Sequence, residues 1–323
     1  MHQLHRHLLK IFLSILMLSP FAALAQEAYP SKTVRIIVPW TAGGGTDALA
    51  RLVAQTLTDK WGKPVVVENR PGGEGVIGSQ VVAQAPPDGH TLLWAIHSHV
   101  ITPSVRASMP FDTLKAFSAV TLVANTPYVV AVPPSLGVNN IAGLVALAKS
   151  RPGKLSYGSS DSSARIMGEM IQSTAGIEIV NVPYKGSAQI MTDLIGGHIQ
   201  IGFVSLPSAM QHHKAGTLKM LGVSTLARSP FETAIPTLSE SGLKDFDFPI
   251  WYGLLAPAGT PPDVIAKIHA DLLQASSQSE FRGTLSKAGA NLVLNTPQVF
   301  DAFLKTEAAK AEKTVKAAGM KPE

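Results

Sequence analysis

Apolar and polar positions along this chain follow two alternating periods, which predicts strands alternating with helices. Short β-branched runs bounded by turn residues predict strands over 33–39, 64–68, 91–96, 128–132, 155–159, 178–182, 199–204, 218–223 and 251–256. Apolar residues at three- and four-residue spacing predict helices that include 46–60, 141–150, 165–175, 187–195 and 296–316. This alternation is typical of an α/β fold with largely parallel sheets.

A chain of 323 residues is long enough for two such domains. We expect the chain to cross between them at 121–127 and again in the turn-rich segment 239–249. The first domain would then be discontinuous, with residues 26–124 plus 250–323. The second domain would be continuous, with residues 125–249, and the helix over 296–316 would pack back on the first.

The first 25 residues have the pattern of an export signal. Arg6 and Lys10 precede an apolar core at 11–18, and Ala23-Leu24-Ala25 matches a small-residue cleavage site. The apolar run is too short to span a bilayer, so a cleaved signal is favoured over an N-terminal membrane anchor.

The composition excludes several classes of function. The chain has no Cys, which excludes disulfides, thiolate catalysis and Cys-based metal sites. Residues 1–25 carry two basic and no acidic residues, so their removal lowers the formal net charge from +5 to +3. That charge is too mild to indicate nucleic-acid binding, and no basic stripe interleaved with aromatics is present. A weak positive field modestly favours an acidic solute.

The most specific candidate site is a glycine-rich loop between a predicted strand and a predicted helix. Glycines allow the backbone to approach a ligand closely, and the N–H groups at a helix N-terminus attract anions. No Lys follows the glycines, so the loop is not the phosphate loop of nucleotide hydrolases. The candidate ligand-binding residues of this first loop are Trp40, Ala42, Gly43, Gly44, Gly45, Thr46 and Asp47.

A second strand–loop–helix junction is rich in hydroxyls. Its four serines and one Asp exceed what capping of one helix needs, although capping remains the alternative for any single residue. If the two sheets open toward each other, this loop faces the first loop across a cleft, and the two helix N-termini would hold one small anion. The candidate residues of this serine loop are Ser159, Ser160, Asp161, Ser162 and Ser163.

A glycine pattern at Gly73, Gly75 and Gly78 is also found in dinucleotide-binding turns. Residues 69–71 separate this pattern from the preceding strand, and the next strand ends without an acidic residue for a ribose hydroxyl. A structural turn between strand and helix is therefore favoured over a dinucleotide site.

Two histidine pairs, His97 with His99 and His212 with His213, do not supply the three or four converging ligands of a metal site. We expect hydrogen-bonded or solvated loop histidines. No HExxH or GxSxG motif is present, and no nucleophile, base and orienting group are brought together. We therefore expect no metal, no cofactor and no catalytic residues, and hence a binding protein rather than an enzyme.

Several motifs together resemble the tripartite tricarboxylate transporter receptors, also called Bug-type extracytoplasmic solute receptors. The motifs are WTAGGGTDALAR at 40–51, ENRPG at 68–72, VPYKGS at 182–187, DLIGG at 193–197 and WYGLLAPAGTP at 251–261. The resemblance runs in order from about residue 29 to the C-terminus. It implies a two-domain, type II-like periplasmic binding protein with a ligand cleft between two α/β domains.

The resemblance also implies how a ligand is held. Backbone amides, hydroxyls and ordered waters of the first loop and the serine loop would bind a small carboxylate, with Trp40 covering it. The implied partner is a membrane transporter of the tripartite tricarboxylate type, and the implied receptor is monomeric. The rival interpretation is a secreted hydrolase or transferase that acts on a carboxylated substrate.

The serine loop departs from the family pattern. It is shorter by about two residues, lacks the usual glycines and has Arg165 where His is usual. Arg165 is expected either to pair with a distal carboxylate or to be a solvated first-turn residue. Asp161 is expected to meet an amine or to cap the helix.

Four further positions complete the candidate set. Tyr184 and Lys185 either line the cleft or form a structural turn near the hinge. Ser98 and Ser205, which lie close to the ends of two predicted strands, are the remaining candidate ligand-binding residues.

Overall fold

The computed structural model describes residues 28–277, 279–317 and 322. Residues 1–31 form one unit and residues 32–323 form another, and the description below concerns the second unit. The export signal expected over residues 1–25 lies outside the described residues. Within the described part of the chain, no helix is both long and apolar enough to cross a membrane.

Strands and helices alternate along most of the chain, as predicted. The strands are β1 (Val34–Val38), β2 (Val65–Asn69), β3 (Thr91–Ile96), β4 (Phe117–Val132), β5 (Leu155–Ser159), β6 (Ile179–Pro183), β7 (Ile201–Ser205), β8 (Lys219–Val223), β9 (Pro249–Pro257) and β10 (Asn291–Leu292). The helices are α2 (Gly45–Trp61), α3 (Val76–Ala83), α4 (Ser98–Val105), α5 (Ile141–Ser150), α6 (Ser162–Ala175), α7 (Ser187–Ile195), α8 (Leu206–Lys214), α9 (Pro262–Ala275), α10 (Ser279–Lys287) and α11 (Pro297–Ala317). Two short 3₁₀ helices are η1 (Gly73–Gly75) and η2 (Pro134–Leu136).

The strands pair in the order β2-β1-β3-β9-β4-β7-β5-β6, with β8 and β10 also pairing with β4. Strand β1 is parallel to β2 and β3, and β5 is parallel to β6 and β7. Strand β9 is antiparallel to β3 and β4, and β4 is antiparallel to β7 and β8. The α/β prediction is confirmed, but the expectation of largely parallel sheets is wrong for the central strands.

Strand β4 belongs to both halves of this arrangement. Its residues from Phe117 to Pro127 pair with β9, whereas its residues from Tyr128 to Val132 pair with β7 and β8. The chain therefore passes between the two sets of pairings inside a strand. The segment 121–127, expected to be an interdomain crossing, is part of β4, because its apolar side chains are buried in continuity with those on either side.

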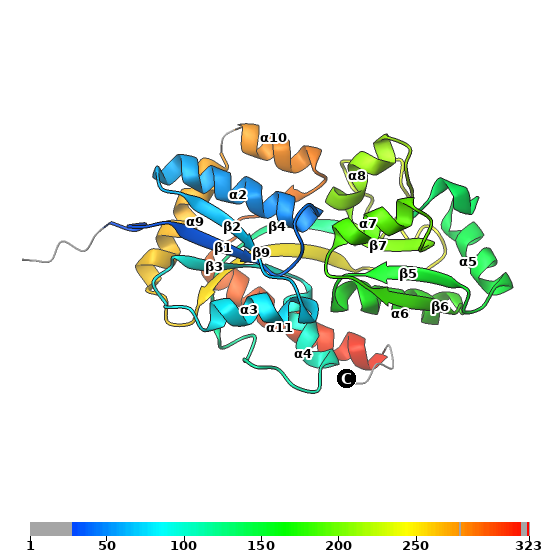
Figure 1. The fold of residues 1–323 in the computed structure, drawn as a ribbon, viewed down its shortest axis with the longest axis horizontal. Helices are drawn as coiled ribbons and strands as arrows, with labels where there is room; N and C mark the ends of the chain where they lie inside the picture. Colours follow the sequence, from blue (N-terminus) through cyan, green and yellow to red (C-terminus); the bar gives the residue numbers. More distant parts are fainter. Residues whose placement is uncertain (1–27, 278, 318–321, 323) are drawn as a thin grey trace, which may run out of the picture. The chain divides into compact units, whose positions relative to one another are not determined.

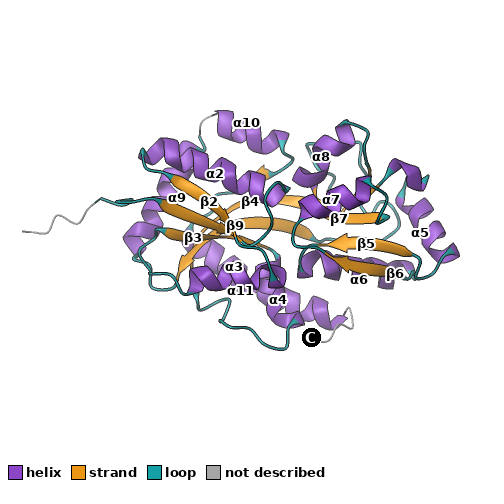
Figure 2. Ribbon diagram, viewed as in Figure 1, coloured by secondary structure: helices purple, strands orange, loops and turns teal. Residues whose placement is uncertain are grey.

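We call residues that pack around β1, β2, β3, β9 and the start of β4 the first half, and those around β5–β8 and the end of β4 the second half. In the first half, α2 and α10 lie on one face of the strands and α3, α4 and α11 on the other (Figure 1). In the second half, α7 and α8 lie on one face and α6 on the other (Figure 2). Both halves therefore have helices on both sides of a sheet, which is the layering of α/β domains.

Helix α11 packs back on the first half, as predicted from its apolar stripe. Phe300 is fully buried, and its ring meets that of Trp251 on β9 edge-on at a centroid distance of 5.8 Å. Gly253, the next inward position of β9, leaves the space that the Phe300 ring occupies. A Cβ at Gly253 would overlap this ring, with the Phe300 Cε1 atom only 2.8 Å away.

We therefore expect Gly253→Ala to lower the free energy of unfolding by about 1–3 kcal/mol, the usual cost of overpacking a core. Gly283→Ala is the matched control, because Gly283 lies within α10 and a Cβ there would meet no atom within 4 Å. Alanine favours a helix over glycine, so this control should raise the free energy of unfolding by about 0.5–1 kcal/mol. Urea titration of both variants measures the two effects, and equal changes would contradict this account of Gly253.

Candidate ligand-binding site

The first loop, between β1 and α2, is held in place by Asp47. The Asp47 Oδ2 atom accepts hydrogen bonds from the Gly43 amide at 3.0 Å and from Arg51 Nε at 2.9 Å. Its Oδ1 atom accepts from Asn69 Nδ2 at 2.9 Å, and Asn69 Nδ2 also donates to the Trp40 carbonyl. Asp47, a predicted ligand-binding residue, thus ties the loop to α2 and to the end of β2, and it does not line the cavity described below.

Three hydrogen bonds determine the ionisation of Asp47. Burial raises its pKa, but the hydrogen bonds from Arg51, Gly43 and Asn69 outweigh burial and hold the pKa below the ordinary value of 3.8. Asp47 is therefore ionised at neutral pH, and its charge stabilises the loop conformation.

The first loop also contacts the second half directly. The Thr41 amide donates to the Lys185 carbonyl at 3.2 Å, and the Gly45 amide donates to Ser208 Oγ at 3.0 Å. Below these contacts, Thr102 Oγ1 on α4 and Ser162 Oγ on α6 share a hydrogen bond of 2.9 Å. The two halves therefore meet through both main-chain and hydroxyl groups.

Close approach requires glycines in the first loop. A Cβ at Gly44 would overlap the Ser187 hydroxyl, and one at Gly45 would lie 2.8 Å from Ser208 Oγ and 2.9 Å from Pro207 Cβ. Gly44 has an ordinary extended conformation with φ of −86°, so the reason for glycine there is space. The amides of Gly43 and Gly45, both expected to hold a ligand, instead bond to Asp47 and Ser208.

Between the halves lies a cavity with about 410 Å³ of space, counting its open mouth. Of the predicted site residues, the structure places six along it: Trp40, Gly44, Thr46, Ser160, Asp161 and Ser205. Sequence reasoning missed four polar lining residues, Thr41, Tyr128, Ser187 and Tyr252, and four apolar ones, Ile96, Phe203, Val204 and Ile250. The cavity thus combines hydroxyl groups with an apolar wall.

All four missed polar residues lie within segments that the sequence had already marked. Thr41 is the second residue of the WTAGGGTDALAR motif. Ser187 ends the VPYKGS motif, Tyr252 is the second residue of the WYGLLAPAGTP motif, and Tyr128 starts a predicted strand. No signal in a single sequence places Tyr128 and Tyr252 in one cavity, because this depends on the antiparallel pairing of β4 with β9 and then with β7.

Two buried polar atoms of the residues that line this cavity lack a hydrogen-bond partner among the described residues. They are Trp40 Nε1 and Thr41 Oγ1. The Tyr252 hydroxyl lies beside the hydroxyls of Ser205 and Thr46, which also line the cavity. Burial raises the pKa of Tyr252 to about 12, so its phenol keeps its proton at neutral pH. Each of these groups can donate to a ligand, and an unsatisfied buried donor is costly unless a partner arrives.

Asp161 caps helix α6 and lines the same cavity. Its Oδ1 atom accepts from the amides of Ser163 and Ala164 at 2.9 and 3.1 Å and from the Tyr128 hydroxyl at 3.2 Å. Its Oδ2 atom accepts from Ser160 Oγ at 3.0 Å. Burial nevertheless raises the pKa of Asp161 above 3.8, because it outweighs these four hydrogen bonds.

The remaining residues of the serine loop and the turn after β6 serve other contacts and do not line the cavity. Ser159 Oγ donates to Asn181 at 2.7 Å, and Ser162 bonds to Thr102 as above. Tyr184 donates to Asp193 at 2.6 Å, while Lys185 is exposed and contributes main-chain atoms to the first loop and to Gln189.

Arg165 also lies away from the cavity-lining set. Its charge is close enough to Tyr157 to lower the pKa of that phenol, although burial, the larger effect, raises it. Ala42 and Gly43, on the exposed side of the first loop, are likewise outside the lining set.

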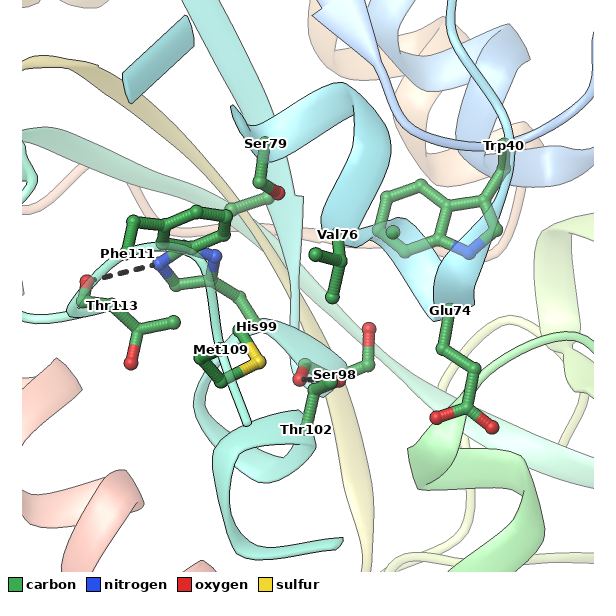
Figure 3. Close-up of a pocket in the computed structure, with 12 residues that line it drawn as sticks. Trp40, Glu74, Val76, Ser79, Ser98, His99, Thr102, Met109, Phe111 and Thr113 are labelled. Carbon is green, nitrogen blue, oxygen red and sulfur yellow. Dashed lines mark hydrogen bonds between the residues drawn. The ribbon is translucent and has the colours of Figure 1, made fainter. Parts of the chain in front are cut away.

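A second cavity lies beside the first, with Trp40 lining both. Figure 3 shows Trp40 and Val76 above Ser98 and Thr102, with Glu74 at one side. Ser98 belongs to this second cavity, and its hydroxyl is buried without a partner among the described residues. Of the predicted ligand-binding residues, Ser98 and Trp40 are thus the two that line it.

Both histidine pairs lie at or within helices, so the expectation of loop histidines is wrong. His97 is the residue before α4 and His99 is in its first turn, because α4 begins directly at the end of β3. Both are buried, and burial lowers the pKa of each to about 4. Across the described residues, no cluster of three or more His, Cys, Asp or Glu could hold a metal ion.

The glycine pattern at 73, 75 and 78 forms the predicted structural turn. Gly73 and Gly75 lie in η1, and Gly78 lies in α3, where a Cβ would be 2.8 Å from the Arg70 carbonyl oxygen and 2.9 Å from Pro39 Cα. The glycines thus allow α3 to lie against the first loop.

The chain is similar in sequence to a known family of proteins. A family model described as the tripartite tricarboxylate transporter family receptor matches residues 49–320. Protein BugT of Bordetella pertussis is 32% identical over 304 residues, which cover 93% of this chain and 93% of that protein.

Two solved structures are also similar. A periplasmic transporter is 39% identical, with a TM-score of 0.88 over 91% of this chain and 99% of that one. An R. palustris protein with adipate is 32% identical, with a TM-score of 0.89 over 91% of this chain and 100% of that one.

The Gly44 contact leads to a prediction about ligand affinity. Gly44→Ala should weaken binding about 5- to 150-fold, because the added Cβ overlaps the Ser187 hydroxyl and separates the halves. The double variant Gly44→Ala, Ser187→Ala should recover part of this loss, since the Ser187 Cβ lies 3.7 Å from the added atom. Calorimetry on both single variants and the double variant measures the coupling, and additive losses would contradict a steric cause.

The Asp47 clamp leads to a prediction about pH. A carboxylate whose pKa is depressed in the folded state adds stability above its unfolded pKa and loses it as the pH falls through its folded pKa. Asp47→Asn should therefore lower the free energy of unfolding by about 1–3 kcal/mol at pH 7, and the gap to the wild type should shrink below about pH 4. Asp59→Asn, an exposed position of the same helix, is the control and should have little effect. A gap that stays constant from pH 7 to pH 3 would show that ionisation of Asp47 is not the cause.

Proposed function

The chain belongs to the tripartite tricarboxylate transporter family receptors, and from this premise we propose how it works as a solute-binding receptor. It binds a small carboxylate in the cavity between its two α/β halves and presents it for transport. The predicted family and the periplasmic-binding-protein fold are confirmed by the comparisons.

The observation that carries the binding proposal is a set of buried, neutral donor groups on residues that line one cavity. Trp40 Nε1 and Thr41 Oγ1 have no hydrogen-bond partner among the described residues, and the protonated Tyr252 hydroxyl lines the same cavity. A carboxylate accepts about four hydrogen bonds and so matches such a set of neutral donors. Because Tyr252 keeps its proton at neutral pH, its hydroxyl can donate a hydrogen bond to the anion and adds no negative charge to the cavity.

A solved relative of 32% identity contains adipate, which supports an organic acid as the general class of ligand. The site residues we propose for ligand contact are those that line the cavity, including Trp40, Gly44, Thr46, Ser160 and Ser205. The direct contacts at Thr41 and Gly45 belong to the closed receptor in this proposal, and hinge motion at the junction within β4 and β9 would open the cleft.

We also propose the cellular setting. The N-terminal pattern supports export with cleavage after Ala25, and the receptor role supports a periplasmic location. The proposed partners are the membrane subunits of a tripartite tricarboxylate transporter, which a monomeric receptor would meet. The proposed domains are residues 26–124 plus 250–323 and residues 125–249. Hydrolysis or group transfer is not part of this function, since the family consists of solute receptors.

A ligand screen tests the receptor proposal. A panel of organic acids should contain at least one that raises the melting temperature of the full mature chain. At a concentration about a hundredfold above Kd, the expected stabilisation is ~2.7 kcal/mol. The bound acid should be recovered chemically unchanged, at one molecule per chain. Conversion of the acid, or stabilisation by nucleotides alone, would contradict the proposal.

A variant pair tests the position of the site. Tyr252→Phe removes a buried donor of the cavity and should weaken binding of the acid found in the screen about two- to tenfold. Tyr157→Phe is the control, because the Tyr157 hydroxyl lies near Glu169, away from the cavity lining. Equal affinities of the two variants would place the ligand elsewhere.

A further inference from the structure

The cavity wall contains a negatively charged residue and no positively charged one, although the proposed ligand is an anion. Among the described residues that line it, Asp161 carries the one formal charge, and no Lys or Arg is present. Asp161 is 5% exposed, so water screens its charge poorly. An acid that enters this cavity therefore meets neutral donors and one carboxylate of the protein.

Capping of α6 does not by itself explain a charged residue here. Asn and Ser cap a helix about as well as Asp, and neither brings a charge into the cavity wall. Helix α5 of the same half is capped by the exposed, neutral side chain of Asn140, which accepts from the Gly143 amide at 2.7 Å. The buried cap residue, Asp161, is thus the charged one, and the exposed cap residue, Asn140, is neutral.

Asp161 also retains the capacity to accept another hydrogen bond. Its Oδ1 atom accepts three, from two amides and the Tyr128 hydroxyl, whereas its Oδ2 atom accepts one, from Ser160. Each oxygen of a carboxylate has two lone pairs, so Oδ1 is fully occupied while Oδ2 has one lone pair that no group among the described residues uses. A donor on the ligand therefore has a place at Oδ2, and an acceptor has none.

We propose that Asp161 determines the ligand class: the receptor selects monocarboxylates that have an N–H donor, as an amide or an amine, at the far end, and rejects dicarboxylates. This rests on the proposed function, that the cavity binds a carboxylate. The ligand's single carboxylate meets the neutral donors Thr41 and Tyr252, and its N–H group donates to Asp161. A second carboxylate in that place faces a buried carboxylate without a cation between them, which costs affinity.

Matched ligands test this directly. Succinate and succinamate differ only in whether the far group is a carboxylate or an amide, and adipate and adipamate form the same pair at greater length. β-Alanine and 6-aminohexanoate supply the amine. At pH 8, calorimetry on the full mature chain should show that, at the length that fits, the monoamide or the amine binds at least about tenfold more tightly than the diacid.

Asp161→Asn then assigns the selectivity to this side chain. Asn keeps the helix cap, so the variant is expected to fold. The tenfold advantage of the amide or amine over the diacid should disappear, mainly because the diacid binds more tightly. Asp112→Asn is the matched control, since Asp112 also accepts from two backbone amides and carries the same charge, but is exposed and outside the cavity. It should leave the wild-type order unchanged.

The outcomes separate this inference from the receptor function. Equal or tighter binding of the diacid by the wild type overturns the inference, while the receptor function stands. An advantage of the amide or amine that survives in Asp161→Asn also overturns it. If the wild type binds none of these ligands and no acid of the wider panel, the receptor proposal itself fails. The wild-type comparison needs no variant, so the inference is tested even if Asp161→Asn is unstable.

Discussion

The antiparallel pairing of β4 with β9 is the contact on which both halves depend. It runs from Phe117 opposite Pro257 to Pro127 opposite Pro249, and β4 then continues for five residues as a strand of the second half. The main-chain hydrogen bonds of these two strands thus connect the cores of both halves without a flexible linker. Any motion between the halves must bend a paired, buried region, which favours a few discrete arrangements over many.

The same pairing positions the cavity. Tyr128 is the first residue of β4 to pair with the second half, while Ile250 and Tyr252 lie near the start of β9. All three line the cavity, because it lies where the strands change partners. The loops that follow β1 and β5, the end of β3, strand β7 and the start of α7 supply the rest of the wall. Its polar part consists of neutral hydroxyl and indole groups and the one carboxylate of Asp161.

Much of the fold was predictable because its elements are strongly periodic. The strand over 91–96 and the helix over 141–150 agree with the predicted bounds residue for residue. The segment 121–127, expected as a crossing, is a paired part of β4, and the change of partners follows directly after it at Tyr128. A single sequence does not show this, because pairing with β9 is a tertiary contact. Helix α4 was missed because it is short, follows β3 without a loop and contains Pro103.

The candidate site was predictable only in part, for a related reason. Sequence motifs identified the loops at 40–47 and 159–163, and six residues of these two loops line the cavity. The motifs did not reveal that Asp47 accepts a hydrogen bond from Asn69 or that Ser208 accepts one from the Gly45 amide. Both contacts are between residues far apart in the sequence, which only the tertiary fold brings together. Tyr128 and Tyr252 were missed for the same reason.

The contacts of the first loop with Lys185 and Ser208 have one further consequence. Each involves a main-chain amide of the loop, from Thr41 or Gly45, and the glycines let the loop approach the second half closely. Gly45, Lys185 and Ser208 do not line the cavity, so these contacts do not depend on the side chains of the cavity wall. In the proposed receptor, a transporter that contacts this surface would meet the same arrangement with different solutes. Substitutions in the cavity wall can then change the cargo over evolution without any matching change in the membrane partner.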